Sequence, residues 1–320
     1  MGQGDAILVE AGDADILVDG GPSGSAVLSY LAGQVVPDID LVVATHLHAD
    51  HIGGLDDGMV QYDVQEVWTN GATASTQTYQ DFAAAVAAEG AVERQIRRGY
   101  STQFGGVTLT ALDPTDPLTG DSNGDSKVLR LFCGSVDVLL TGDANADSEA
   151  SMLADPSVVL DADLLKVGHH GSSTSTTDAF LDAVTPQEAV ISVGAGNTYG
   201  HPTQETPDRL AAHGATVYRT DLNSTVVLTS DCSTCTIRPS VPLPQATPAP
   251  ATAPPPPPPP PPPTSNCEPC YPDGCIPIGA ADYDCAGGSG NGPNYIQGPV
   301  RVVCHLDPHG LDANGDGWGC

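Results

Sequence analysis

The stretch "THLHADHIGG", residues 45–54, constrains this chain more than any other. It follows the apolar run "LVVAT" (41–45), which is typical of a buried strand ending at a polar loop. Within six positions it carries four side chains that commonly bind metals: His46, His48, Asp50 and His51. A chance group of polar loop residues does not easily explain this density, so the stretch predicts a metal site.

The spacing of these four residues indicates two ions. His46 and His48 lie two apart at the end of an extended strand, so their rings point the same way and can reach one ion. Asp50 and His51 follow as the chain turns toward a short helix expected near Ile52, and they suit a second ion close by. Imidazole and carboxylate ligands fit Zn²⁺, with Mn²⁺ or Fe as substitutes.

Strands and helices alternate along the first three quarters of the chain, which predicts an α/β fold of two sheets covered by helices. The expected strands are 6–10, 16–19, 41–45, 107–112, 128–132, 136–140, 163–167, 189–193, 217–219 and 225–229. The expected helices are 25–32, 80–89, 147–153, 177–184 and 206–213.

A proline-rich segment divides the chain. Ten consecutive prolines, 254–263, favour a polyproline II spacer roughly 30 Å long. We therefore predict an α/β domain over 1–238, a linker over 239–266 and a small cysteine-rich module over 267–320.

The net charge is −30, and Lys127 and Lys166 are the only lysines. Such a surface repels polyanions, and nucleic-acid affinity normally rests on Lys and Arg contacts to phosphates. The charge argues against tight duplex binding but not against hydrolysis of a phosphate ester. No run in the chain approaches the about 18 consecutive apolar residues of a membrane span.

"HLHADHIGG" resembles the HxHxDHxGG signature of metallo-β-lactamase-fold hydrolases, which implies an αββα sandwich binding one or two metals at its edge. "ILVDGG" (16–21) looks like the family strand whose Asp19 supports the histidine loop. "LLTGD" (139–143) looks like the strand that delivers Asp143, the carboxylate that bridges two metals.

Three further stretches narrow the resemblance to the hydrolase domain of ComEC-type DNA-uptake proteins and related secreted phosphodiesterases. They are "MGQGDAILVE" (1–10), "LKVGHHGS" (165–172) and "YGHP" (199–202). No histidine lies between Ile52 and Gly168, where many family members place a third one. This departure leaves His46, His48 and Asp143 for the first metal, and it disfavours β-lactamase and glyoxalase II activity.

The resemblance also implies roles for the remaining site residues. Asp50, His51 and Asp143 would hold the second ion with one of His169 and His170; we favour His170 as ligand and His169 as substrate contact or proton donor. His201 is a candidate for phosphate contact or general acid. The alternative for His201 is a capped loop histidine before Pro202.

The last 54 residues contain six cysteines, a density typical of a disulfide-stapled module of an exported protein. "LDANGDGWGC" (311–320) contains D-x-N-x-D-G, the first half of an EF-hand-like calcium loop, with the ligands Asp312, Asn314 and Asp316. The stretch resembles the excalibur calcium-binding module of bacterial surface proteins. That resemblance implies a Cys285–Cys320 pair and association with the cell surface.

Three cysteines lie upstream. Cys232 and Cys235 are spaced as a further pair, and Cys133 sits in an apolar strand, where we expect it to be packed without a partner. Met1 stands where the ComEC-like branch has a valine, so we hypothesise that a GTG codon was read as the start. The true beginning, with an export signal, would then lie upstream.

Together these features predict an exported, zinc-dependent enzyme, with manganese as a substitute metal. The leading function is a phosphodiesterase or nuclease, acting on a phosphodiester such as single-stranded DNA. One alternative is a secreted phosphodiesterase or esterase on cell-surface polymers or phosphorylcholine. Another is a non-catalytic surface-binding protein with a vestigial site, which the complete ligand set disfavours.

Overall fold

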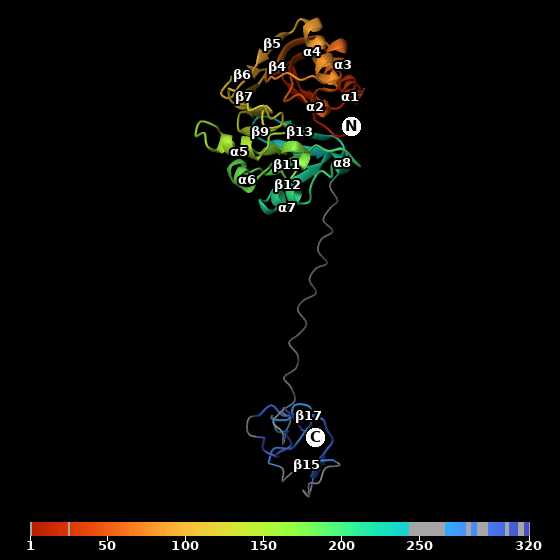
Figure 1. The fold of residues 1–320 in the computed structure, drawn as a ribbon, viewed down its shortest axis with the longest axis vertical. Coiled ribbons are helices and arrows are strands. Elements are labelled where there is room, and N and C mark those ends of the chain that lie inside the picture. Colours follow the sequence, from red (N-terminus) through yellow and green to blue (C-terminus); the bar gives the residue numbers. More distant parts are fainter. Residues whose placement is uncertain are drawn as a thin grey trace. The chain divides into compact units, whose positions relative to one another are not determined.

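The computed structural model describes residues 2–24, 26–242, 266–279, 283–286, 294–304, 307–312 and 317–319. The chain divides into two compact units, Met1–Gln245 and Ala246–Cys320 (Figure 1). Most of the predicted linker, including all ten consecutive prolines, lies outside the described residues. Among the described residues, no helix has the length and apolar character needed to cross a membrane.

The first sheet of unit 1 contains, in spatial order within the described residues, β1 (Ala6–Ala11), β2 (Ala14–Gly20), β3 (Ile39–Val43), β4 (Val64–Thr69) and β5 (Val92–Gln95). β1 and β2, near the expected strands 6–10 and 16–19, form an antiparallel hairpin, and the strands from β2 to β5 run parallel. The helices of this half are α1 (Ala26–Gln34), α2 (Ala49–Ile52), α3 (Leu55–Gln61) and α4 (Gln77–Glu89).

The second sheet has the order β12-β11-β10-β9-β8-β7-β6. Its strands are β6 (Ser101–Phe104), β7 (Val107–Asp113), β8 (Val128–Cys133), β9 (Val136–Leu140), β10 (Leu164–Lys166), β11 (Glu188–Ile191) and β12 (Thr216–Arg219). Its helices are α5 (Ala146–Leu153), the 3₁₀ turn η1 (Gly168–Gly171), α6 (Asp178–Val184), α7 (Glu205–Ala212) and α8 (Thr220–Asn223).

The two sheets pack face to face, with helices on the outer side of each (Figure 1). Side chains alternate across β2: Ile16 and Val18 face the second sheet, whereas Leu17 faces the helices of its own half. Phe82 of α4 and Phe180 of α6 anchor the two outer cores. The predicted αββα sandwich is confirmed, and its sheets bring the ends of β3, β9 and β10 to one edge.

The prediction for the cysteines of unit 1 is wrong. Cys133 is not packed alone; it forms a disulfide with Cys232, and Cys235 is a free thiol. The hairpin of β13 (Val226–Ser230) and β14 (Cys235–Pro239) places its turn against the β8–β9 turn, where the Ser135 amide donates to the Cys232 carbonyl at 2.8 Å. Long-range packing, rather than proximity in sequence, selects the partner of Cys232.

Unit 2 is small and cross-linked. Disulfides join Cys267 to Cys275 and Cys270 to Cys304, around a core that includes Tyr271 and Ile276. Its strands are β15 (Tyr283–Cys285), β16 (Asn294–Ile296), β17 (Val300–Arg301) and β18 (Trp318–Gly319). Of the predicted calcium ligands, Asp312 is described, whereas Asn314, Asp316 and the predicted partner Cys320 lie outside the described residues.

Candidate metal centre

The predicted metal-binding side chains gather at one edge of the sandwich. His46 and His48 follow β3, Asp50 and His51 lie in α2, Asp143 follows β9, and His170 lies in η1 after β10. The helix expected near Ile52 begins earlier, at Ala49, so Asp50 and His51 belong to its first turn. Because β3, β9 and β10 end at the same edge, residues about 120 positions apart in sequence meet there.

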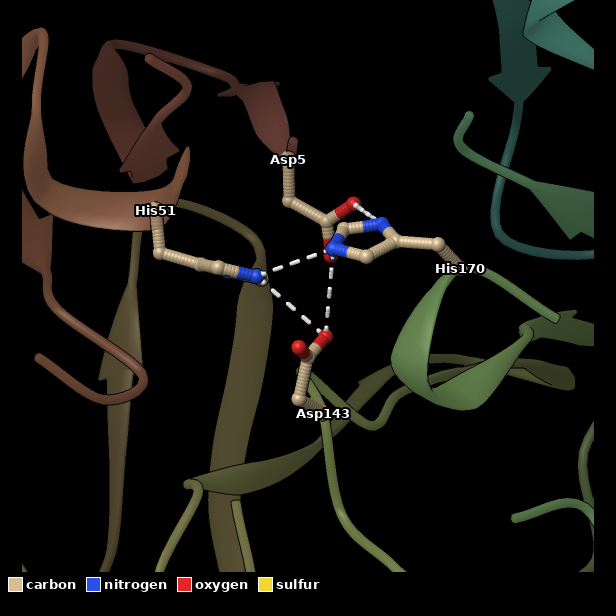
Figure 2. Close-up of side chains that lie close together, drawn as sticks. All are labelled: Asp5, His51, Asp143 and His170. Atoms are coloured by element: carbon tan, nitrogen blue, oxygen red, sulfur yellow. Dashed lines mark hydrogen bonds and ion pairs between the residues drawn. The ribbon is translucent and has the colours of Figure 1, made fainter. Parts of the chain in front are cut away.

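The carboxylate of Asp143 lies at the centre of the site and is almost fully buried. Its Oδ1 is 3.2 Å from His51 Nε2 and 3.5 Å from His170 Nε2 (Figure 2). Its Oδ2 is 3.7 Å from His46 Nε2 and 3.8 Å from His169 Nε2. Each oxygen of one carboxylate therefore faces a different set of imidazoles.

Hydrogen bonds on the side of each ring away from the cluster determine which nitrogen faces the cluster. His51 Nδ1 lies 2.7 Å from Asp19 Oδ2, so His51 Nε2 faces the cluster. His170 Nδ1 lies 2.9 Å from the Ser192 carbonyl, which can only accept, so this nitrogen carries the proton. Asp19 also accepts from the Thr45 amide at 2.8 Å and the Thr45 hydroxyl at 2.7 Å. The structure thus places Asp19 behind the histidine loop.

His46 and His48 form a second group with Asp143. His46 Nε2 is 3.0 Å from His48 Nδ1, and suitable ligand atoms of the three residues all lie within 4.8 Å of one another. His46 is fully buried, whereas His48 is exposed. This group contains the three residues predicted for the first metal.

Sequence reasoning missed Asp5, which precedes β1 and is fully enclosed. Asp5 lies close to His51, Asp143 and His170 in the other cluster (Figure 2). Its Oδ2, however, is 2.9 Å from Lys166 Nζ, and its Oδ1 is 3.5 Å from His170 Nδ1, the ring nitrogen opposite Nε2. Asp50 instead approaches His170 Nε2, at 3.3 Å. We therefore assign Asp5 to the support of His170 and keep Asp50 among the candidate ligands.

The two neighbouring histidines of "GHHG" have separate positions. His170 is buried and points its Nε2 at the cluster, whereas His169 is partly exposed and lies beside it. Both adopt left-handed backbone conformations, with φ of 47° and 54°. Such a conformation costs a non-glycine residue about 1–3 kcal/mol and persists mainly at functional sites.

A neutral group of side chains lies next to the cluster on the His169 side. Asn123 Nδ2 is 3.4 Å from His169 Nε2, and the ring of His201 has its centroid 5.6 Å from that of His169. Asn123 Oδ1 and His201 Nδ1 are buried atoms without a hydrogen-bond partner among the described residues. Each of these atoms is therefore available to a water molecule or to a ligand.

The histidines of the site fall into two groups by the direction in which their pKa values are shifted. Burial opposes charge on His51 and His170, but the carboxylates around them outweigh it. Asp143 and Asp19 raise the pKa of His51 well above its usual range, and Asp5 and Asp50 raise the pKa of His170 to about 9. Burial and the neighbouring charge of His51 hold the pKa of His46 well below its usual range. Burial lowers the pKa of His169 and of His201 as well.

These contacts fit a metal better than a self-contained polar cluster. The Nδ1 atoms of His51 and His170 bond Asp19 and the Ser192 carbonyl, so in the neutral rings the two Nε2 atoms, 3.3 Å apart, both present lone pairs to each other. A cation between them and the carboxylates would satisfy both lone pairs. The donor set is that of zinc, manganese or iron sites.

The sequence matches a known family over residues 1–195, the metallo-beta-lactamase superfamily. This match covers more than half of the chain and includes every candidate ligand except those in unit 2. The chain belongs to this superfamily.

The chain is similar in sequence to competence proteins. Competence protein ComA of Neisseria gonorrhoeae is 32% identical over 225 residues, and ComE operon protein 3 of Bacillus subtilis is 30% identical over 200 residues. The alignments cover 69% and 62% of this chain but 30% and 26% of those proteins. The chain therefore spans less than a third of the length of these relatives.

Solved structures show the same fold. A mutant of the CmlA beta-hydroxylase, an enzyme of Streptomyces venezuelae, matches 68% of this chain and 51% of its own with a TM-score of 0.50 and 16% sequence identity. The likeness shows the fold alone, because one fold supports unrelated chemistries.

Metal binding should release protons in a pH-dependent way. Without metal, both ring nitrogens of His170 carry a proton below about pH 9. A metal can bind Nε2 only after the proton on that nitrogen has left. We expect Mn²⁺ affinity to rise with pH toward 9, with about one to two protons released per protein at pH 7 and fewer at pH 9.5.

Calorimetric titration in two buffers of different ionisation enthalpy measures this release. His213→Ala is a matched control, because His213 contacts Asp178 and Asp182 away from the site. Mn²⁺ binding without proton release at pH 7, or with equal release at both pH values, would contradict the assignment of His170.

Proposed function

We propose that unit 1 is a metal-dependent phosphodiesterase that cleaves nucleic acid, with single-stranded DNA as the favoured substrate. The observation that carries the proposal is the position of Asp143, whose two oxygens face two separate sets of histidines. A carboxylate so placed can join two ions, and paired ions suit displacement at phosphorus. The competence relatives support a nucleic-acid context.

In this proposal His46, His48 and Asp143 would hold one ion, and Asp50, His51, His170 and Asp143 would hold the other. Bound divalent ions supply positive charge for the phosphate and lower the pKa of water toward neutrality. Asp19 and Asp5 orient His51 and His170 from behind. The ions would hold the phosphate in place of basic side chains, because Lys166 forms an ion pair with Asp5.

The neutral group beside the cluster would hold the substrate. Asn123 and His201 each have an unsatisfied buried atom: Asn123 Oδ1 can accept from a hydroxyl of the substrate, and His201 Nδ1, when it carries the proton, can donate to a phosphate oxygen. His169 lies between them and Asp143, where it can contact the substrate or pass a proton to the leaving oxygen.

The activity itself is testable on the full-length protein loaded with Zn²⁺ or Mn²⁺. We expect turnover of bis-p-nitrophenyl phosphate and of single-stranded oligonucleotide, and none of nitrocefin. Asp50→Ala should lower kcat/KM on both phosphodiesters by more than about 100-fold, because it removes a candidate ligand. Asp57→Ala, an exposed aspartate in the next helix, is the control.

Two outcomes would count against this function. Phosphodiester turnover that is absent with either metal, or that is unchanged in Asp50→Ala, would refute a catalytic centre here. Turnover restricted to p-nitrophenyl phosphorylcholine would favour the alternative of an esterase on surface polymers.

We propose further that the protein works outside the cytoplasm, with unit 2 as an excalibur-like calcium-binding module at the cell surface. The disulfides of both units support an oxidising compartment. Asp312 Oδ2 accepts from the Gly317 amide at 2.8 Å, so these two residues lie next to each other.

Calcium binding can be followed through Trp318, which lies directly after this loop and is 51% exposed, whereas the chain's other tryptophan, Trp68, is fully buried in unit 1. We expect a saturable, EGTA-reversible change in tryptophan fluorescence with Ca²⁺. The change should be lost in Asp312→Ala. No Ca²⁺-dependent change in the unaltered protein, or the same change in Asp312→Ala, would reject the module's calcium site.

A further inference from the structure

An exposed aromatic ring lies near the candidate metal centre, on its His169 side. Tyr199 is 69% exposed, and its ring stacks on that of His201, with centroids 6.2 Å apart and planes inclined by 17°. His201 in turn lies 5.6 Å from His169, whose Nε2 is 3.8 Å from Asp143 Oδ2. Tyr199 is therefore two ring-to-ring steps from the histidine that contacts the central carboxylate.

The loop holds Tyr199 in this position through one asparagine. Asn197 Oδ1 accepts from the backbone amides of Tyr199 and His201, both at 3.1 Å. Asn197 Nδ2 donates to the carbonyls of Gly194 and His201, at 3.0 and 2.7 Å. The ring is thus presented to solvent by a loop whose backbone the Asn197 side chain holds in place.

Single exposed apolar side chains are common on protein surfaces, so exposure alone means little. Tyr199 differs from exposed residues such as Val60 and Phe132 in its neighbours. It continues a row of flat, neutral side chains that begins at Asn123 and His169, next to the metal centre. A flat apolar group joined to a phosphate in that centre would extend over this row.

We propose that Tyr199 is a stacking platform for a nucleobase next to the scissile phosphate, and that this platform gives the site its preference for single-stranded nucleic acid. The proposal rests on the phosphodiesterase function proposed above and specifies its substrate. Base–aromatic stacking needs an unpaired base, and it tolerates any base because each has a flat face.

The charge of the chain favours such a platform. Proteins usually hold nucleic acid with lysine and arginine, but this chain has 10 basic residues against 40 acidic ones. Stacking does not depend on net charge, so it can retain a base where the surface repels phosphates. The quaternary ammonium group of phosphorylcholine is less suited to this platform, because such a group is normally enclosed by several aromatic rings.

The test compares two single-stranded substrates cleaved by the metal-loaded, full-length protein: an oligothymidylate and a strand of the same length made of abasic nucleotides. Tyr199→Ala should lower kcat/KM on the oligothymidylate by about 10-fold or more and leave the abasic strand unaffected. Tyr199→Phe, which keeps the ring, should retain activity. Phe132→Ala removes an exposed ring at the end of β8 away from Asp143 and should change neither rate.

Equal losses on both strands would show that Tyr199 supports the loop rather than a base, and no loss on either would remove it from binding. A larger loss on p-nitrophenyl phosphorylcholine than on oligothymidylate would replace the base by a cationic headgroup. All three results overturn the proposal.

A binding measurement tests the platform independently of the proposed phosphodiesterase activity. An oligonucleotide containing 2-aminopurine loses fluorescence when its base stacks, whether or not it is cleaved. Quenching by the unaltered protein and by Tyr199→Phe, but not by Tyr199→Ala, supports the platform even where turnover is absent. Quenching that Tyr199→Ala leaves intact refutes it even where turnover is present.

Discussion

The site depends on one buried carboxylate whose two oxygens point in different directions. Asp143 follows β9 at the edge of the second sheet, and it meets histidines carried by the first sheet. An isolated buried charge of this kind is costly unless it is paired. The imidazoles provide that pairing and hold the pKa of Asp143 well below its usual range, although burial alone would raise it. The contacts between Asp143 and the histidines therefore join the two sheets at this edge, and they also form the candidate metal centre.

Around this carboxylate, the supporting residues reduce the freedom of each ligand. Asp19 fixes His51, the Ser192 carbonyl fixes His170, and the Lys166–Asp5 pair braces the far side of the His170 ring. The left-handed backbone of His169 and His170 turns one ring into the cluster and the other toward Asn123. In the proposed function, metal ligation and substrate contact are thus divided between these two adjacent residues. Ligand rings held in this way would already be oriented before a metal or a substrate arrives.

Much of this arrangement follows from local sequence patterns. The apolar runs of β2, β3 and β9 predict their strands, and "THLHADHIGG" predicts the ligands after β3, because both signals are continuous in sequence. β5 is exposed along its whole length, so it lacks the apolar pattern that marks a buried strand. Asp5 has no pattern around it, and its role arises from Lys166 and His170, more than 160 residues away. The choice between His169 and His170 depends on backbone angles, and the Cys133–Cys232 disulfide depends on how two turns pack.

The central claim is that Asp143 joins two metal positions, and anomalous diffraction from crystals of the full-length protein grown with Zn²⁺ tests it most directly. The account predicts two separate anomalous peaks, one near His46 and His48 and one near His51 and His170, with an oxygen of Asp143 directed at each. A single peak, or a peak that Asp143 does not contact, would contradict the account.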